Sequence, residues 1–419
     1  MDFFAQQNGE LFAEKMAVAK MAEQVGTPFY CYSQATLERH VTVFRGGLKK
    51  LNPLICFAVK ANSNLAVLSV LAQLGVGADV VSEGEARRAI AAGIAPSKIV
   101  FSGVGKTREE MRFALETGIF QFNVESDREL LALNEVALSL KKKAAIALRV
   151  NPDVDAGTHA KISTGKKENK FGIDIDKAPE IYALAATLPG ILVQGVSTHI
   201  GSQLTQLEPF RAAYIRVRKL VEALRAQGIA IRTIDIGGGL GVPYAEGDAP
   251  PLPEAYGAMA SEVFAGLAAE YIVEPGRLIV GNAGILVARV LYIKRAARNY
   301  LIVDAGMNDL MRPALYDARH EMVTVRAPKN ATTSLFDVVG PVCESSDVFA
   351  QQVPLPADIA EGDLIAFRTA GAYGASMANS YNSRLMVPEV LVHGEKFAVV
   401  RPRPDYAQML AAEAMPNWK

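Results

Sequence analysis

The sequence has few cysteines, no excess of charge of either sign and no long apolar run. Its three cysteines, Cys31, Cys56 and Cys343, are scattered and odd in number, which excludes a disulfide framework and a closed zinc site. Lys+Arg and Asp+Glu each number 44, so no net charge attracts nucleic acid or an anionic membrane surface. No uncharged apolar run reaches the roughly 20 residues that span a bilayer. We therefore expect no nucleic-acid partner, no membrane partner and no metal.

The first residues also lack the pattern of an exported protein. The stretch "MDFFAQQNGELFAEKM" has no basic segment followed by an apolar core, which a secretory signal requires. Together with the sparse cysteines, this predicts a cytoplasmic protein.

A regular alternation of short β-like runs with longer helical patterns dominates residues 54–276. The runs are PLICFAVKAN, GADVVS, KIVFSG, FQFNVES, AAIALRVNP, LVQGVSTHI, TIDIGGGLG and YIVEPGR. Between them lie helical patterns such as TREEMRFALETG, in which Thr107 and Glu110 form a capping-box signature and Gly118 marks the end. Eight β-then-α repeats predict an α/β fold, a TIM-like (β/α)8 barrel. A doubly wound open sheet is the alternative, because alternation alone does not show that the sheet closes.

The pattern changes after about residue 282. Runs such as ILVARVLYIKRA, YLIVDAG, HEMVTVRA, SLFDVVG, DLIAFRTAGAY and RLMVPEVLVHGEKFAVV are typical of a second, mostly antiparallel β domain. The stretch TPFYCYS near residue 30 precedes the first barrel strand and is expected to join that domain. We therefore predict a barrel over 36–281 and a β domain over 1–35 and 282–419, with an irregular polar insertion at 152–170 in the barrel.

Chemically versatile residues stand at the ends of the predicted barrel strands. Each has an ordinary explanation when taken alone, because strand ends meet solvent. The carboxyl ends of barrel strands converge on one mouth, however, where active sites lie. The set comprises Lys60, Asp79, Arg149, His199, Ser202, the glycines at 237–239, Glu274, Gly276 and Arg277. Together these residues predict an active site.

The glycine-rich run after the seventh strand favours a phosphate site. It is not a dinucleotide fingerprint, because that motif belongs to the first βα turn. Barrels often bind one phosphate with the loops after strands seven and eight, and Gly238, Gly239 and Gly276 leave backbone N–H groups open to an anion. A phosphate site opposite Lys60 predicts pyridoxal 5'-phosphate, held as a Schiff base on that lysine.

The other strand-end residues then acquire roles around such a cofactor. Glu274 is expected to keep the ring nitrogen protonated, which makes the ring a strong electron sink. His199 is expected to lie on the flat face of the ring, and Arg149 to reach the ring oxygen.

At this point the order of motifs resembles a known family. FAVKAN, ADVVSEGE, HIGSQ, DIGGGLG, EPGR, MRPALY, GPVCESSD and GAY follow one another as in the alanine-racemase-like, fold type III pyridoxal-phosphate decarboxylases, over nearly the whole chain. The resemblance implies that Lys60 carries the cofactor, with Asp79, Arg149 and Ser202 around it. It further implies that Tyr373 lies beside the cofactor and that Cys343 donates a proton. It also implies a homodimer with shared active sites, in which the CES segment of one subunit reaches into the other.

The same resemblance gives a set of substrate-binding residues: Arg277, Arg312, Tyr316, Glu344 and Tyr373. Two guanidiniums and one acid suit a substrate whose far end carries both a carboxylate and an ammonium, such as meso-2,6-diaminopimelate. We therefore expect decarboxylation of this compound to L-lysine, the last step of lysine biosynthesis. A decarboxylase of ornithine, arginine or lysine on the same fold, a non-catalytic cofactor-binding regulator and an amino-acid racemase are the alternatives. The racemase is disfavoured because racemases of this fold pair the ring nitrogen with arginine, where this chain has Glu274.

Overall fold

The computed structural model describes residues 2–155, 170–245, 247–328 and 332–418. Most of the predicted polar insertion lies outside the described residues. Contacts divide the chain into two compact units. The first consists of Met1–Thr36, Tyr244–Gly247 and Val280–Lys419, and the second of Leu37–Pro243 and Asp248–Ile279. We call these the β unit and the barrel unit.

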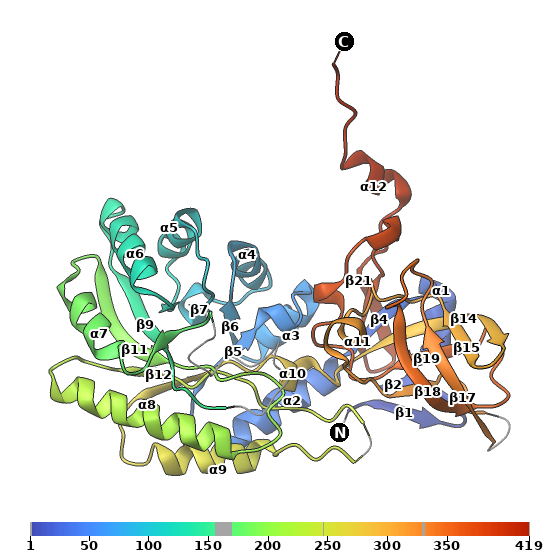
Figure 1. Ribbon diagram of the computed structural model, residues 1–419, viewed down its shortest axis with the longest axis horizontal. Helices are drawn as coiled ribbons and strands as arrows, with labels where there is room; N and C mark the ends of the chain where they lie inside the picture. Colours follow the sequence, from blue (N-terminus) through green and yellow to red (C-terminus); the bar gives the residue numbers. More distant parts are fainter. Residues whose placement is uncertain (1, 156–169, 246, 329–331, 419) are drawn as a thin grey trace. The chain divides into compact units, whose positions relative to one another are not determined.

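The barrel unit is a closed ring of parallel strands (Figure 1). In the described part of the chain its eight strands are β5 (Leu54–Ala58), β6 (Gly77–Val80), β7 (Ile99–Phe101), β8 (Gln121–Val124), β9 (Ala144–Asn151), β11 (Ile191–Ser197), β12 (Thr233–Asp235) and β13 (Glu270–Val273). Each strand pairs in parallel with the next, β8 pairs with β9, and β13 returns to β5. A short strand, β10 (Ile173–Asp174), adds to β9. The closure confirms the predicted barrel and excludes the open sheet.

Helices surround the ring (Figure 1). They are α2 (Gln34–Gly47), α3 (Leu65–Gln73), α4 (Glu83–Ala91), α5 (Arg108–Thr117), α6 (Asp127–Ser139), α7 (Ala178–Thr187), α8 (Glu208–Ala226), α9 (Pro253–Val263) and α10 (Arg277–Val280), with short 3-10 turns η1 (Val59–Ala61) and η2 (Pro96–Lys98). Side-chain caps fix where several begin, because Asn64, Ser82 and Ser126 accept hydrogen bonds from backbone N–H groups of the first turn. The predicted capping box of Thr107 and Glu110 is confirmed.

The β unit is built on a sheet in the order β18-β17-β15-β14-β4-β20-β21, with β19 joining β14 and β16 joining β19. Its strands are β4 (Phe29–Ser33), β14 (Gly284–Arg295), β15 (Asn299–Val303), β16 (Met322–Thr324), β17 (Thr333–Val339), β18 (Val348–Pro356), β19 (Leu364–Phe367), β20 (Glu389–His393) and β21 (Lys396–Arg401). The pairings are antiparallel except β15–β17 and β20–β4. Strand β4 is the predicted TPFYCYS strand, which joins this sheet as expected.

Some elements of the β unit were not predicted from the sequence. A three-stranded sheet of β1 (Phe4–Gln7), β2 (Glu10–Ala13) and β3 (Met16–Ala17) precedes helix α1 (Val18–Val25), and β18 pairs along much of β17. Two prolines and two glutamines make β18 look like a loop. The remaining helices are α11 (Arg312–Tyr316) and α12 (Tyr406–Ala411), with turns η4 (Ala375–Met377) and η5 (Tyr381–Ser383).

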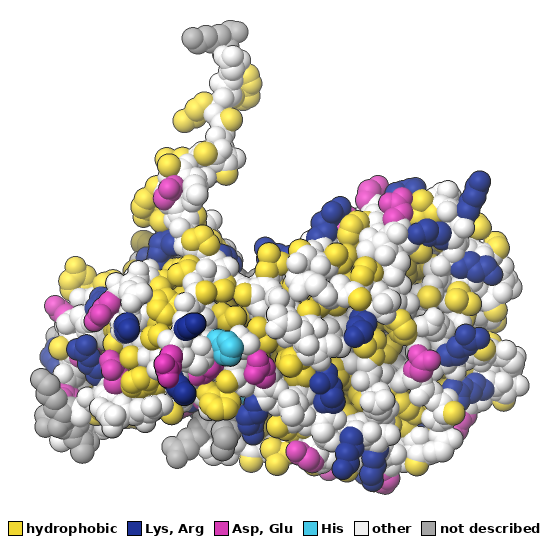
Figure 2. All heavy atoms as spheres, turned by 180° about the vertical axis from the view of Figure 1, so that it is seen from behind, with side chains coloured by type: hydrophobic (Ala, Val, Ile, Leu, Met, Phe, Trp, Pro, Cys, Tyr) yellow, Lys and Arg dark blue, Asp and Glu magenta, His cyan; other side chains and the backbone are white. Residues whose placement is uncertain are grey.

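The surface carries charges of both signs side by side, as Figure 2 shows for one face. This mixture agrees with the equal numbers of acidic and basic residues. Among the described helices, none combines the length and the apolar character that crossing a bilayer demands.

Gly195 in β11 provides a test of the barrel packing. A Cβ at this position would lie 1.9 Å from Oγ1 and 2.6 Å from the carbonyl oxygen of Thr233 in the neighbouring strand. We expect Gly195→Ala to lower the free energy of unfolding by about 1–3 kcal/mol, because overpacking a rigid core is destabilising. Thermal unfolding followed by circular dichroism measures this. Gly46→Ala, in helix α2 with no atom within 4 Å of the added carbon, is the matched control and should leave the melting temperature unchanged or raised. Equal melting temperatures of the two variants would contradict the packing argument.

Candidate active site

Lys60 lies at the carboxyl end of the first barrel strand. The sequence had placed Lys60 within the strand, but β5 ends at Ala58 and Lys60 belongs to the turn η1 that follows it. Its Nζ donates to Oδ2 of Asp79 in β6 at 2.8 Å. The Asp79 side chain is 0% exposed, while that of Lys60 is 38% exposed. A fully buried carboxylate therefore anchors an amine that still reaches an open space.

That space is a pocket of about 430 Å³ in the barrel unit, within the size range of small-ligand sites. Its lining includes four residues predicted for the site, Lys60, Arg149, His199 and Glu274. The remaining lining residues are Val81, Ser102, Gly103, Val104, Gly105, Glu110, Phe171 and Ser197. Residues from six different strands or the turns after them thus converge on one cavity, as the strand-end pattern predicted.

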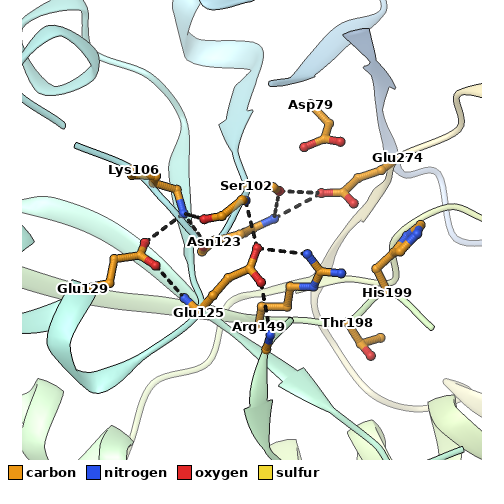
Figure 3. Close-up of polar contacts among 12 residues, drawn as sticks. Asp79, Ser102, Lys106, Asn123, Glu125, Glu129, Arg149, Thr198, His199 and Glu274 are labelled. Carbon is orange, nitrogen blue, oxygen red and sulfur yellow. Dashed lines mark hydrogen bonds and ion pairs between the residues drawn. The ribbon is translucent and has the colours of Figure 1, made fainter. Parts of the chain in front are cut away.

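Glu274 follows β13 and is held by a polar network inside the barrel (Figure 3). Asn123 Nδ2 donates to Glu274 Oε1 at 3.1 Å and to Asp235 Oδ2 at 2.9 Å. Ser102 Oγ donates to the same Glu274 oxygen at 3.4 Å. Gln121 in turn donates to Asn123 Oδ1 at 2.9 Å. These bonds fix the orientation of the Asn123 amide and hence the position of the Glu274 carboxyl.

The surroundings of Glu274 favour the protonated form of its carboxyl group. Burial raises the pKa of Glu274 well above its ordinary value, and the nearby charges of Asp235 and Asp79 raise it further. Burial also raises the pKa of Asp235, but hydrogen bonds from Glu274, from the Gly237 N–H and from Asn123 oppose that rise. The hydrogen bond between the two carboxyl groups raises the pKa of Glu274 and lowers that of Asp235, so protonation of the pair is favoured on Glu274. A carboxyl at the wall of a pocket that carries a proton can share it with a bound ring nitrogen.

His199 is a neutral imidazole. Burial lowers the pKa of His199 well below its ordinary value, and the positive charges of Arg149 and Lys60 lower it further. The Gly238 N–H donates to Nδ1 of His199 at 3.2 Å, so Nδ1 is the unprotonated nitrogen. An uncharged ring whose orientation is set by the glycine loop suits stacking on a flat ligand.

Arg149 is oriented by a buried carboxylate that the sequence did not reveal. Its Nη1 donates to Glu125 Oε1 at 2.9 Å, and the two side chains are 10% and 1% exposed. The Gly103 N–H donates to the same oxygen at 2.8 Å, and the Gly172 N–H donates to Oε2 at 3.0 Å. Both oxygens of Glu125 are thus engaged, which fixes the direction of the guanidinium (Figure 3).

A second buried ion pair, between Lys106 and Glu129, lies next to the segments that carry Glu125 and Asn123. Lys106 Nζ contacts Glu129 Oε1 at 2.8 Å, with side chains 1% and 7% exposed, and also donates to the carbonyl oxygens of Gly103 and Asn123. Glu129 Oε2 accepts from the Glu125 N–H at 3.0 Å. The pair therefore stabilises the chain segments that carry Glu125 and Asn123.

The glycine-rich turns fit the phosphate end of pyridoxal 5'-phosphate. A Cβ on Gly238 would lie 2.1 Å from the Glu274 carbonyl oxygen, and one on Gly239, whose φ is +104°, would lie 2.3 Å from the Gly201 carbonyl oxygen. The N–H groups of Gly239 and Gly276 donate to no other described residue. Arg277 Nη2 donates to Ser202 Oγ at 3.0 Å, which brings these two predicted residues together.

The ring end of the cofactor also fits. Asp79 Oδ1 is buried and accepts no hydrogen bond from the residues that the structure describes, and buried polar atoms are normally satisfied. An amine, a proton-bearing carboxyl, a neutral imidazole and a fixed guanidinium line one pocket. The donor set therefore matches the charges and the flat ring of pyridoxal 5'-phosphate.

The remaining predicted residues belong to the β unit. Arg312 and Tyr316 are the first and last residues of helix α11. Cys343 is exposed, and its N–H donates to Asn382 Oδ1 at 2.8 Å. Next to it, Glu344 Oε2 accepts from the hydroxyl of Tyr381 at 2.9 Å. Tyr373 follows β19 with a φ of +55°, a conformation that non-glycine residues adopt rarely.

Several residues around the pocket escaped the sequence reasoning. They are Ser102, Lys106, Asn123, Glu125, Glu129 and Asp235. A signal for one of them, Asn123, was present, because Asn123 and Gln121 are polar residues at alternate positions of a strand that is buried along its length. Such a period-two polar pattern indicates side chains that point into a barrel.

Known proteins are similar to this chain over nearly its whole length. The family model described as "Pyridoxal-dependent decarboxylase, pyridoxal binding domain" matches residues 34–281. A diaminopimelate decarboxylase of Pseudomonas aeruginosa is 51% identical over 416 residues, which cover 99% of this chain and 99% of that protein. The crystal structure of diaminopimelate decarboxylase from Helicobacter pylori complexed with L-lysine has a TM-score of 0.91 and 43% identity, and the match covers 94% of this chain and 98% of that chain. Diaminopimelate decarboxylase from M. jannaschii in complex with L-lysine has a TM-score of 0.94 and 36% identity, over 99% and 98% of the two chains.

The raised pKa of Glu274 predicts how stability depends on pH in protein stripped of cofactor. An unfolded glutamate ionises near 4.5, whereas folded Glu274 keeps its proton to higher pH. Above pH 4.5 the folded state therefore binds more protons than the unfolded state, and its stability falls as pH rises toward the folded pKa. Glu274→Gln removes this dependence, so the variant should gain stability relative to the unsubstituted protein between pH 5 and pH 8. Thermal unfolding across that range measures the gain.

Glu262→Gln is the matched control for that experiment. The pKa of Glu262 is lowered by its hydrogen bond from Arg211, so its contribution to stability changes only below about pH 4.5. The stability difference caused by Glu262→Gln should stay constant from pH 5 to pH 8. A constant difference for Glu274→Gln over the same range would contradict the assignment of the buried proton.

Proposed function

Because the chain belongs to the pyridoxal-dependent decarboxylases, we propose that it decarboxylates meso-2,6-diaminopimelate to L-lysine and carbon dioxide. The observation that carries the proposal is the convergence of Lys60, His199 and Glu274 on one pocket of the barrel unit. The choice of substrate is supported by relatives about half identical along the full chain that are named diaminopimelate decarboxylase. The reaction is the last step of lysine biosynthesis, which links the enzyme to that pathway.

Pyridoxal 5'-phosphate, when bound, supplies an electron sink for the electron pair left by departing carbon dioxide. Lys60 holds the group covalently through Nζ, and Asp79 keeps that nitrogen in place. Glu274, whose pKa is raised by burial, would share a proton with the ring nitrogen, while Asn123 and Asp235 hold its carboxyl in position. His199, a neutral imidazole at the pocket wall, would stack on the ring.

Two further parts of the barrel unit orient the cofactor. Glu125 fixes the Arg149 guanidinium, which would donate to the ring oxygen of the cofactor. Gly238, Gly239 and Gly276, with Ser202 and Arg277, hold the phosphate through backbone N–H groups and side chains. Such fixed dipoles stabilise charge without reorganising during the reaction.

Cys343 returns a proton to the α-carbon of the substrate. Its exposure in the β unit supports a role for the CES segment in the active site of a second copy, so we infer a homodimer with shared sites. Asn382 and Tyr381 hold the backbone and the acid next to Cys343 in place. Free thiols at all three cysteines support a reducing, cytoplasmic setting.

The far end of the substrate is recognised by opposite charges. Arg312 and Arg277 bind carboxylates through their planar, two-pronged donors, while Glu344 binds the distal ammonium. Tyr316 and Tyr373 complete the set of substrate contacts. A basic amino acid such as ornithine lacks the distal carboxylate and leaves a buried guanidinium without its partner, which costs about 1–3 kcal/mol or more.

The reaction itself is tested with purified protein and added cofactor. Carbon dioxide release from meso-2,6-diaminopimelate is expected, with far slower release from L-ornithine, L-arginine and L-lysine, because only the first substrate pairs with both arginines and Glu344. Release from ornithine alone would contradict the proposed substrate.

Lys60→Ala should abolish both turnover and the visible absorbance of the bound cofactor. Borohydride reduction of the unsubstituted enzyme should leave the cofactor on the peptide that contains Lys60, and labelling of another lysine would contradict its role.

The proton donor and the shared site are tested together. Cys343→Ala should lower kcat by about 10²–10⁴-fold with a smaller effect on KM, because a positioned proton donor contributes that much.

Mixing refolded Cys343→Ala and Lys60→Ala subunits in equal amounts should restore about a quarter of the activity, because half of the dimers then contain one complete site. No recovery in a mixture proven to contain mixed dimers would contradict sharing of the site between subunits.

A further inference from the structure

The guanidinium of Arg312 is held on two sides by side chains of the β unit. Arg312 Nη1 donates to Nε2 of His320 at 2.9 Å. The guanidinium carbon lies 4.5 Å from the centroid of the Tyr244 ring. The Tyr244 and His320 rings meet edge to face at 84°, with centroids 5.3 Å apart. Arg312 and His320 are each only 6% exposed, so this arrangement is a buried one.

The partners of His320 fix its protonation state. His320 Nδ1 lies 2.8 Å from the backbone carbonyl oxygen of Arg368, which can only accept a hydrogen bond, so Nδ1 carries the proton. The guanidinium of Arg312 can only donate, so Nε2 of His320 is the acceptor. The imidazole is therefore neutral, with its proton on Nδ1. A protonated ring would place two donors against each other at the Arg312 contact.

The turn after helix α11 brings His320 back to Arg312. Asp317 ends the helix with a φ of +53°, and its N–H donates to the Arg312 carbonyl oxygen. The Ala318 N–H points to the same oxygen at 3.4 Å. The chain thereby reverses between Arg312 and His320, which lie eight positions apart, so the contact is built into the local fold.

We propose that His320 is a positioning residue that holds Arg312 to bind the far carboxylate of the substrate, and thereby sets specificity for substrates that end in a carboxylate. Packing against the Tyr244 ring fixes the plane of the guanidinium, and the hydrogen bond to His320 fixes how the guanidinium is rotated within its plane. A guanidinium held in this way loses less conformational entropy when it binds a carboxylate. The inference rests on the proposed function for the identity of the substrate.

The chemistry of the partner supports this role over a purely structural one. A carboxylate at position 320 would also orient Arg312, but it would neutralise part of the charge that attracts the substrate. A neutral imidazole gives an acceptor without adding negative charge. The guanidinium is therefore oriented while its attraction for an incoming carboxylate is preserved.

Kinetics of variants of the complete, cofactor-loaded enzyme test the proposal. His320→Ala should raise KM for meso-2,6-diaminopimelate about 10-fold or more, as expected for a charged hydrogen bond, with kcat changed less than about 3-fold. His320→Gln should restore most of the affinity, because its amide oxygen can accept from Arg312 while its NH2 donates to the Arg368 carbonyl. His393→Ala, at an exposed histidine of the same unit, is the control and should leave both constants unchanged.

A double-mutant cycle separates positioning from general damage. In an Arg312→Ala background, His320→Ala should add little further increase in KM, because the group that it positions is already gone. Additive effects, an equal fall of kcat in the single variant, or failure of glutamine to restore KM would each overturn the proposal.

A spectroscopic measurement decides the pairing independently of turnover. The chain has 5 histidines, so ¹⁵N-histidine NMR of the complete enzyme, with His320→Gln to assign the signal, can read the protonation state of His320. A neutral ring protonated at Nδ1 is expected, and a doubly protonated ring or a proton on Nε2 overturns the inference. If the unsubstituted enzyme does not turn over meso-2,6-diaminopimelate, the proposed function fails, while the NMR result still decides whether His320 accepts from Arg312.

Discussion

The parallel pairing of β13 with β5 is the constraint on which the active site depends. Only two residue pairs, Ile272 with Leu54 and Val273 with Ile55, join these strands, and the Ala58 N–H extends the contact by donating to the Pro275 carbonyl oxygen at 3.1 Å. This short strand pairing closes the barrel, and it places the turn that carries Lys60 beside the segment that begins with Glu274. The chemistry of the site is therefore a consequence of how the barrel closes.

Closure concentrates acidic groups in a small dry volume. Asp79 and Asp235 are completely buried, and Glu274 is nearly so. Loss of hydration and mutual repulsion oppose ionisation of these carboxyl groups, and they raise the pKa of Glu274 and of Asp235. The amide of Asn123 in β8 and the hydroxyl of Ser102, just after β7, donate hydrogen bonds to these carboxyl groups and offset part of the cost. A bound group with a positive charge at this point would relieve the repulsion, so affinity for such a group and the instability of the empty site have one physical origin.

Much of the fold could be predicted from the sequence because its signals are periodic. The alternation of buried runs with capped helices gives the barrel, and the polar residues at strand ends give Lys60, Asp79, Arg149, His199 and Glu274. The network behind them could not be predicted in the same way. Asn123, Glu125 and Asp235 are ordinary polar residues in sequence, and only the closed ring brings together side chains that lie more than a hundred positions apart. Likewise β18 and the β1–β3 sheet depend on pairing partners rather than on their own composition.

The contacts of the two carboxylate oxygens of Glu125 limit which residues can replace it. One oxygen contacts Arg149 and the Gly103 N–H, and the other accepts from Gly172 at the start of the described chain beyond the insertion. An aspartate, shorter by one methylene, retains the charge but cannot span these three partners. The length of the Glu125 side chain, and not only its negative charge, is therefore needed to connect the segments at the ends of β7, β8 and β9.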